Sequence, residues 1–308
     1  MAITVRTVLC SLDSTTAGKC LMTPLIKRLL LPSLLLALVH SANADTDTEL
    51  AKQSQNPVAN IISLPFENNA SFDVGPSGKK MYTTNIKPVY PMPIGKSLNL
   101  INRMVAPVIY LEGQDKKDLM PGQEVDTGPG FVFPGTSNEF GLGNIQYMGY
   151  FSPAQPGKVI WGVGPVLELP TNTDSALGTD TWSAGPAAVV LTMPGNWVVG
   201  VLAQNIWDFA GDSDEPDINK STLQPIINYN MNDGWYLSAT TTMTANWEAD
   251  SGDEWTVPLG GGFGRLIRFG KQPVDLKFMS YWNVEKPQFA ADWSMQFTVK
   301  FLIPKSAG

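Results

Sequence analysis

The sequence has 308 residues, of which 43% are hydrophobic and 16% are charged, and its formal net charge is −7. An acidic chain lacks the excess of lysine and arginine that neutralises phosphates, so nucleic acid is not an expected partner. One histidine and two cysteines leave little material for metal binding or nucleophilic chemistry.

Residues 1–44 are predicted to be a secretory signal region. Lys27 and Arg28 precede an apolar stretch at 29–39, and 42–44 (Ala-Asn-Ala) has the small-residue pattern of a cleavage site. The apolar stretch is shorter than the roughly 20 residues of a transmembrane helix. Either Met22 is the true start of the protein, or residues 1–21 form a long positive region of the signal peptide.

Cleavage after Ala44 removes Cys10, Cys20 and His40, which are all the cysteines and histidines of the chain. The remaining chain has no thiol and no imidazole, which excludes a cysteine nucleophile, a Cys/His metal site and a Ser-His-Asp triad. We therefore expect no catalytic residues, no metal site and no cofactor. An enzyme that works through a pair of carboxylates is the remaining alternative within that class.

Residues 45–68 are predicted to form a helical segment ahead of the main domain. Within 48–64, Leu50, Val58, Ile61 and Ile62 can form an apolar side, and Pro57 can interrupt the helix or begin a second piece. The segment is either a leader outside the domain or a plug that enters it. We favour the plug, because a leader that left these apolar residues exposed would be poorly soluble.

The remainder of the chain alternates between apolar and polar residues, most clearly in 235–247 and 293–303. This period of two places the two kinds of side chain on opposite faces of a strand. Most runs exceed the usual 5–6 residues of a strand and match the roughly 9–11 that cross a bilayer at a tilt. The fold class is therefore all-β, an antiparallel transmembrane β-barrel of about twelve strands over 69–305. The expected strands are 69–75, 81–92, 97–110, 140–152, 158–169, 181–193, 197–209, 221–231, 235–247, 254–269, 273–284 and 292–303.

The connections between these runs alternate in length from the second strand onward. Tight turns are expected at 93–96, 153–157, 194–196, 232–234 and 270–272. Longer and often acidic connections are expected at 111–139, 170–180, 210–220, 248–253 and 285–291. Outer-membrane barrels have short turns on the periplasmic side and longer loops outside. A soluble β-sandwich, which also alternates, is the competing interpretation.

All nine tryptophans of the chain lie near the ends of the expected strands. An indole ring favours the level of the lipid headgroups, where an apolar ring meets a wet N–H group. Two aromatic belts are therefore predicted, one at each end of the barrel. Their members are Trp161, Trp182, Trp197, Trp207, Trp235, Trp247, Trp255, Trp282 and Trp293.

With the apolar faces toward lipid, the polar faces should fill the lumen. Two interpretations stay open for these residues: they brace and solvate the interior, or they form a selectivity constriction. Tyrosines on the same inward faces, such as Tyr150, could contact an apolar solute. The lumen and selectivity candidates are Arg103, Gln204, Tyr236, Asp275, Lys277, Tyr281 and Lys300.

Two further motifs have simpler explanations than ligand binding. The glycines of 260–264 do not lie between a parallel strand and a helix, so they are not expected to hold phosphate. Glycines within a barrel strand more often mark bends or close packing. The acidic residues of 208–217 lack the spacing of an EF-hand and are predicted to form a solvated external loop.

Several blocks of the sequence resemble one bacterial outer-membrane family, which is named for the meta-pathway of phenol degradation. They include ELAKQSQNPVANIISLPFENN (49–69), LNLINRMVAPVIY (98–110), WDFAGDSDEPDIN (207–219) and EWTVPLGGGFGRLIRFGKQPVD (254–275). Members of this family are often called transporters, and some carry the misleading label "neuromedin U". The resemblance implies a barrel and the uptake of small hydrophobic or aromatic compounds.

The sequence thus predicts an outer-membrane channel or transporter of a Gram-negative bacterium, and not an enzyme. The expected partners are outer-membrane lipid, lipopolysaccharide and a small solute. The alternative is a structural or adhesive barrel with a sealed lumen.

Overall fold

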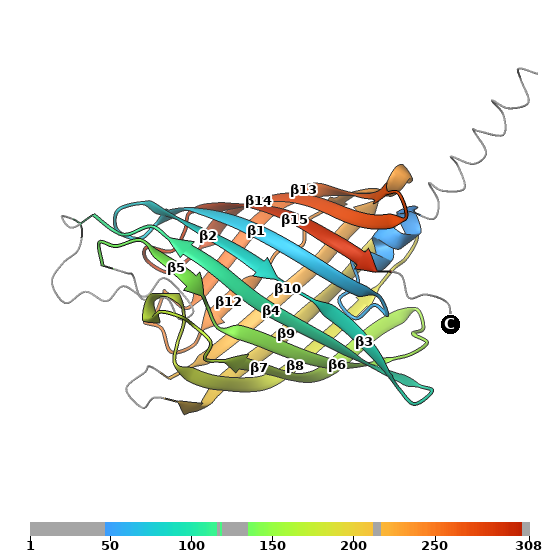
Figure 1. Cartoon of the computed structure of the whole chain (residues 1–308), viewed down its shortest axis with the longest axis horizontal. Helices are drawn as coiled ribbons and strands as arrows, with labels where there is room; N and C mark the ends of the chain where they lie inside the picture. Colours follow the sequence, from blue (N-terminus) through green and yellow to red (C-terminus); the bar gives the residue numbers. More distant parts are fainter. Residues whose placement is uncertain (1–46, 116–117, 119–134, 212–216, 304–308) are drawn as a thin grey trace, which may run out of the picture. The chain divides into compact units, whose positions relative to one another are not determined.

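The computed structural model describes residues 47–115, 118, 135–211 and 217–303. These residues form a closed antiparallel β-barrel of 12 strands with one short N-terminal helix at 47–54 (Figure 1). The expected signal region at 1–44, with Met22 and the cleavage site, lies outside the described residues. Among the described residues no helix is long and apolar enough to span a membrane.

Fifteen β-segments make up the 12 barrel strands, because three pairs of segments share one position in the wall. These pairs are β2 with β3, β5 with β6, and β11 with β12. The barrel closes where β1 pairs with β15, from Ile62 opposite Ile303 to Phe72 opposite Trp293. The segments are β1 (Ile62–Val74), β2 (Lys79–Ile86), β3 (Val89–Ile94), β4 (Leu98–Leu111), β5 (Glu139–Leu142), β6 (Ile145–Pro153), β7 (Val159–Leu169), β8 (Thr181–Thr192), β9 (Trp197–Gly211), β10 (Asn219–Asn230), β11 (Trp235–Ser238), β12 (Met243–Asn246), β13 (Trp255–Phe269), β14 (Gln272–Glu285) and β15 (Trp293–Ile303), with 3-10 turns η1 (Ser175–Leu177) and η2 (Asn232–Gly234).

The predicted barrel and its strand number are confirmed, but the first strand was placed wrongly. β1 begins at Ile62 instead of 69, so the helical character expected over 48–64 holds only for 47–54. Within 62–67 the residues alternate: Ser63 and Pro65 are buried on the inner face, whereas their neighbours are more exposed. Two prolines and a dense run of apolar residues hide this alternation in the sequence.

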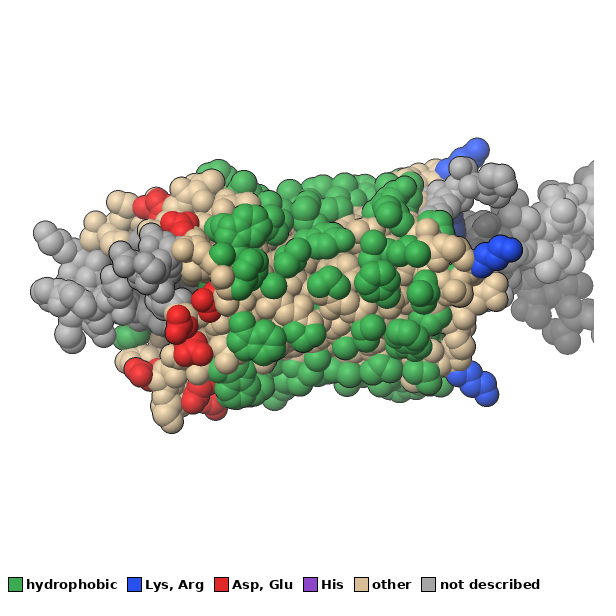
Figure 2. Space-filling view, turned by 90° about the horizontal axis from the view of Figure 1, so that it is seen from below, with side chains coloured by type: hydrophobic (Ala, Val, Ile, Leu, Met, Phe, Trp, Pro, Cys, Tyr) green, Lys and Arg blue, Asp and Glu red, His purple; other side chains and the backbone are tan. Residues whose placement is uncertain are grey.

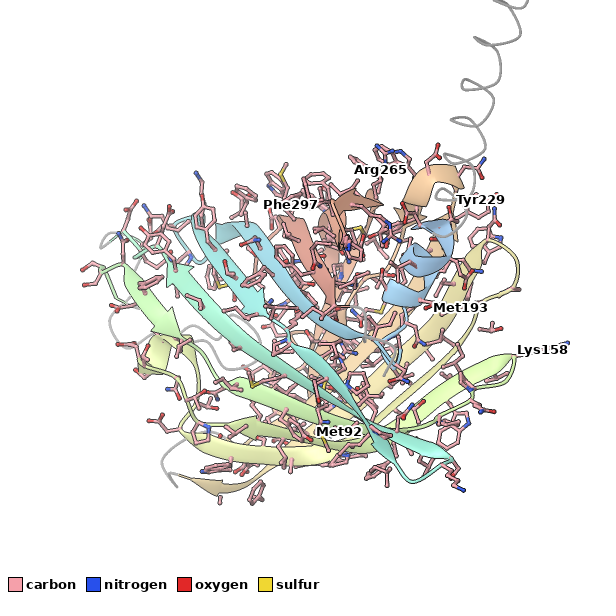
Figure 3. All side chains as sticks on the ribbon, turned by 45° about the vertical axis from the view of Figure 1, so that its right-hand side comes forward. Met92, Lys158, Met193, Tyr229, Arg265 and Phe297 are labelled. Carbon is pink, nitrogen blue, oxygen red and sulfur yellow. The ribbon has the colours of Figure 1, made fainter. Side chains whose placement is uncertain are left out.

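On the face of the barrel that Figure 2 shows, apolar side chains cover much of the middle, between the two charged ends. Large outward side chains are exposed to about half of their area: Val163 to 49%, Leu237 to 52% and Phe263 to 49%. Phe297 of β15 also points outward, whereas Lys158 projects from the turn between β6 and β7 (Figure 3). Such a surface would be poorly soluble in water and suits the hydrocarbon core of a membrane.

The two ends of the barrel differ in charge. Acidic side chains gather at the end with the long connections, and basic side chains at the end with the short turns (Figure 2). All nine tryptophans are exposed or partly exposed, and the two aromatic belts stay a prediction. Trp247 and Trp255 pack edge to face with ring centroids 5.6 Å apart.

Candidate functional site: the barrel lumen

The N-terminal helix lies inside the barrel wall. Ala51 is completely buried among Tyr236 of β11, Leu266 of β13 and Leu302 of β15. All three of these side chains belong to the inner faces of their strands. The segment expected as either a leader or a plug is therefore placed by the structure against the inner wall, at the end with the short turns (Figure 1).

Polar contacts fix the same helix to the wall. The Ser54 hydroxyl donates to Asp275 Oδ2 at 3.0 Å, and Lys300 Nζ donates to the Ser54 carbonyl at 2.9 Å. Gln55 and Asn230 exchange side-chain amide hydrogen bonds of 2.8 and 3.2 Å. An isolated helix of this length would be marginal in water, so these contacts and the buried alanine are what stabilise it.

After the helix, the chain crosses to the opposite wall. Val58 is buried in the apolar cluster formed by inward side chains of β4 and β6 to β10. It faces Gly162 of β7, where an added Cβ would lie 2.9 Å from Val58 Cγ1. Glycine at this position leaves the space that Val58 occupies. The segment from the helix to Ile61 therefore contacts both sides of the lumen.

A cavity of about 160 Å³ lies beside this segment, and most of the predicted lumen residues line it. Asp275 and Lys300 form an ion pair at 3.6 Å, and the Tyr236 hydroxyl donates to Asp275 Oδ1 at 2.7 Å. Asp275 thus accepts hydrogen bonds from Ser54 of the helix and from Tyr236, and it pairs with Lys300, which itself donates to the helix. The predicted residues on this cavity are Arg103, Tyr236, Asp275, Lys277 and Lys300.

The side chains of Arg103 and Lys277 make no direct hydrogen bond or ion pair with the described residues, although Glu67 attracts both at longer range. Arg103 Nη1 is buried without a hydrogen-bond partner among the described residues. The predicted network of Asp275, Lys277 and Lys300 therefore forms only between Asp275 and Lys300. Lys277 remains available to other groups.

The sequence analysis missed a second charged pair on the same cavity. Glu67 of β1 and Lys87, which follows β2, form an ion pair at 2.5 Å. Glu67 was assigned to the helical leader, so its inward position on a strand went unnoticed. The alternation of Glu67 with Phe66 and Asn68, which face outward, could have indicated its inward position.

The prediction of a polar lumen is wrong for one half of the barrel. Near the turn that joins β8 and β9 the inward side chains are aliphatic, and Val189, Leu191, Val198 and Leu202 are each at most 5% exposed. They pack against one another and against Val58, so this part of the interior is filled. The charged residues on the lining of the cavity beside the N-terminal segment lie on β14, β15, β1 and β4 and just after β2.

A second cavity, of about 480 Å³, lies toward the end with the long connections. Its lining is mostly asparagine, serine and threonine, with Glu168 and Lys220 as charged members. Gln204 lies near it and donates to Gln146, which in turn donates to Glu168. Tyr281 also points inward, and its hydroxyl donates to the Thr240 carbonyl at 3.0 Å.

The glycine-rich run 260–264 has a packing role in the wall. At Gly264 an added Cβ would lie 2.2 Å from Tyr236 Cζ, so the tyrosine ring lies directly over this glycine and reaches Asp275 beyond it. The acidic run 208–217 falls largely on 212–216, which lie outside the described residues. Among the described residues no three acidic, His or Cys side chains are grouped as a metal site would require.

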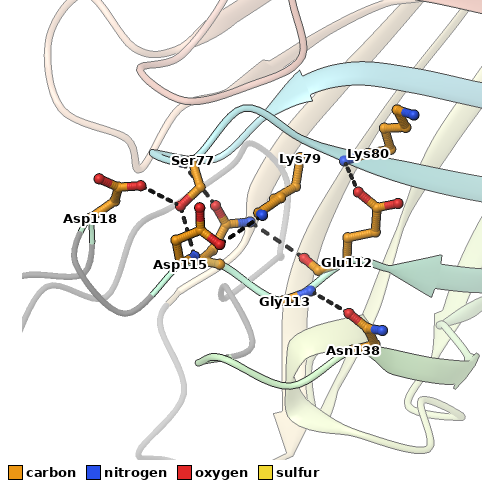
Figure 4. A network of polar contacts seen from close by, with 9 residues as sticks. Ser77, Lys79, Lys80, Glu112, Gly113, Asp115, Asp118 and Asn138 are labelled. Carbon is orange, nitrogen blue, oxygen red and sulfur yellow. Dashed lines mark hydrogen bonds and ion pairs between the residues drawn. The ribbon is translucent and has the colours of Figure 1, made fainter.

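At the end with the long connections, a polar network ties the β1–β2 turn to the segment after β4 (Figure 4). Lys79 Nζ binds Asp115 Oδ1 at 2.8 Å, and the Ser77 hydroxyl donates to Asp118 at 3.0 Å. The Lys80 amide donates to Glu112 at 3.0 Å. This network holds the rim of the barrel and does not reach into the lumen cavities.

The same architecture occurs in a crystal structure of an outer membrane channel from Pseudomonas putida F1. The TM-score is 0.53 at 13% sequence identity, with 79% of this chain and 94% of that chain covered. CdiB from Acinetobacter baumannii also aligns, with a TM-score of 0.35, 9% identity and coverage of 79% of this chain and 60% of that chain, a likeness on which no argument rests. No family model and no curated protein matches the sequence. The likeness to the channel is one of fold.

Proposed function

We propose that the chain is an outer-membrane channel for small solutes, with its N-terminal segment as a plug, and that it is not an enzyme. One observation carries the proposal: two cavities follow one another along the lumen, above a segment that is held at the periplasmic end. Glu67 and Asn69, successive inward residues of β1, line one cavity each. Thr240 and Thr242 do the same on the opposite wall.

The solute class that fits best is hydrophobic or aromatic, in line with the family named for the meta-pathway of phenol degradation, to which we propose that the chain belongs. The aliphatic inner wall of β4 and β6 to β10 supports this. Val58 covers part of that wall, so withdrawal of the plug would uncover an apolar side to the passage. Lipid and lipopolysaccharide are the proposed surroundings, because the apolar middle of the outer surface and the acidic outer rim suit them.

The competing function is a sealed structural or adhesive barrel, and the buried contacts of the plug favour it. The two functions differ in what happens when the plug is removed. In a channel the removal widens an existing path, whereas a barrel sealed by its own wall stays closed.

Single-channel conductance in planar bilayers distinguishes them, with the intact protein compared with a variant that lacks 47–56. We expect a small conductance for the intact protein and a several-fold larger one for the variant, together with faster entry of small aromatic solutes into liposomes. Folding of both proteins is checked by the heat-dependent mobility of the barrel on gels. A folded variant with no conductance and no solute entry would contradict the channel.

A further inference from the structure

Inward polar side chains form a continuous band across neighbouring strands of the charged half. Lys277 of β14 lies opposite Thr298 of β15, and Thr298 lies opposite Glu67 of β1. Glu67 holds Lys87, which lies beside the strand of Arg103 because Arg103 is opposite Val89. Adjacent inward side chains of a sheet are close enough to act on one ligand.

The balance of charge in this cavity favours an anion. Four cationic side chains line it, namely Lys87, Arg103, Lys277 and Lys300, against the two carboxylates of Glu67 and Asp275. Each carboxylate is already paired, with Lys87 and Lys300 respectively. Arg103 and Lys277 are therefore cations without a carboxylate of their own, and the lining of the cavity carries a net positive charge. A bound anion offsets this charge.

Unsatisfied donors point to the same ligand. Arg103 Nη1, Tyr150 Oη and Thr298 Oγ1 are buried and have no hydrogen-bond partner among the described residues. Tyr150 lies opposite Ile101, the next inward residue from Arg103, so the phenol and the guanidinium are diagonal neighbours. A guanidinium and an ammonium can only donate, and a hydroxyl can donate as well. A ligand that only accepts, with two oxygens in one plane, complements this set.

Size and surroundings define the rest of the ligand. The cavity of about 160 Å³ compares with the roughly 150 Å³ of an engineered protein cavity that takes benzene. Apolar side chains on the lining of the cavity include Ile61, Val89 and Ile226, and Val89 lies opposite Arg103. One side of a ligand there would meet charged donors, and the other an apolar wall.

We propose that the band is a binding site for a small carboxylate with an apolar body, such as an aromatic monocarboxylate. Arg103 and Lys277 bind the carboxylate, Thr298 completes its hydrogen bonds, and the apolar residues of the lining receive the body. This inference rests on the proposed channel only in that the solute reaches the site through the lumen; binding itself is separable from passage.

Benzoate binding to the folded full chain in detergent micelles, measured by calorimetry, tests the site. Benzyl alcohol, which keeps the ring and lacks the charge, reports partition into micelles. We expect Arg103→Gln and Lys277→Gln each to weaken benzoate binding by about tenfold or more, as the loss of a charge-assisted hydrogen bond implies. Lys158→Gln, on an exposed turn, is the matched control and should bind like the parent.

Glu67→Gln should change the affinity for benzoate in the opposite direction. It removes one of the two carboxylates and releases Lys87, so benzoate should bind several-fold more tightly. A variant that had merely lost its fold would bind less, so a gain cannot come from misfolding. Gel mobility of every variant confirms that the barrel has formed.

Three results would overturn the site: no benzoate binding, equal binding of benzyl alcohol, or equal displacement of benzoate by inorganic phosphate or chloride. The last would mean a general anion site without recognition of a carboxylate. If benzoate binds as expected but does not cross liposomes that contain the protein, the site stands and the channel fails. If neutral solutes cross and benzoate does not bind, the channel stands and the site fails.

Discussion

Near the turn that joins β8 and β9 the inward side chains are aliphatic and pack against one another, whereas β14, β15 and β1 carry inward charged and hydroxylated side chains that line a cavity. Both walls belong to one barrel and are built from strands of similar length. The apolar half shows that this fold can fill its interior without charges. The need to fill the interior therefore does not explain why β14, β15 and β1 carry charged side chains on their inner faces.

Energetics sharpen this difference. A buried ion pair such as that of Asp275 and Lys300 is often no more stabilising than well-packed apolar residues of similar volume. Arg103 has a buried nitrogen, Nη1, without a hydrogen-bond partner among the described residues, which is costly as well. Charged residues that stability does not require, and that face one cavity, are consistent with the proposed contact with a solute. In that proposal the apolar half is a rigid wall against which the N-terminal segment and the solute are held.

The plug touches both halves, and separating it from the wall should produce the largest effect. Ala51→Asp places an unpaired carboxylate among Tyr236, Leu266 and Leu302, at a cost of several kcal/mol. The other contacts of the short helix are too few to offset this free energy, so the helix should detach from the barrel wall. We expect the single-channel conductance to rise several-fold while the barrel keeps its gel mobility.

Glu49→Gln is the control for that experiment, because Glu49 lies on the exposed side of the same helix. Its conductance should match that of the parent. If Ala51→Asp exposes the helix to protease but leaves the conductance unchanged, the wall itself closes the lumen and the sealed barrel is the better description.

The next largest effect, a loss of stability, is expected in the charged half formed by β14, β15 and β1. Asp275→Ala leaves Lys300 without its partner and the Tyr236 hydroxyl without an acceptor, so the free energy of unfolding should fall by about 3–5 kcal/mol. Asp275→Asn keeps an acceptor for Tyr236 and should lose less. Urea unfolding in lipid vesicles, followed by tryptophan fluorescence, measures both. The exposed Asp250→Ala is the control, and a loss as large as that of Asp275→Ala there would show that the effect is not local.

Much of this contrast could be predicted from the sequence, but only where the period of two was visible. Asp275, Lys277 and Lys300 stand on strands whose alternation was visible, and in the structure they line one cavity. On β7 to β9 the sequence has nearly continuous apolar runs, such as Ala187–Leu191. A continuous run means that both faces are apolar. Because polar residues were expected to fill the lumen, the apolar inner faces of these strands were not predicted.

The start of β1 was predicted wrongly for a different reason. Around Pro57 and Pro65, a few apolar residues fit a helical and a strand period equally well, and only pairing across the barrel decides between them. Phe66 opposite Val299 and Leu64 opposite Phe301 supply that pairing. Contacts between residues so far apart in the chain could not be read from 62–67 alone. For the same reason the pair of Glu67 and Lys87 was missed.

The smallest effect is expected in the apolar half. Val189→Thr changes shape little but places a hydroxyl among aliphatic side chains, which costs about 1–3 kcal/mol without a partner. The neighbouring Val190 faces outward and is 44% exposed, so Val190→Thr should cost less in the same unfolding experiment. Neither change should alter the affinity for benzoate as Arg103→Gln does. If Val189→Thr weakened benzoate binding as strongly as Arg103→Gln, the two halves would not have separate roles, because a change that adds no charge to the rigid wall would then control recognition of the carboxylate.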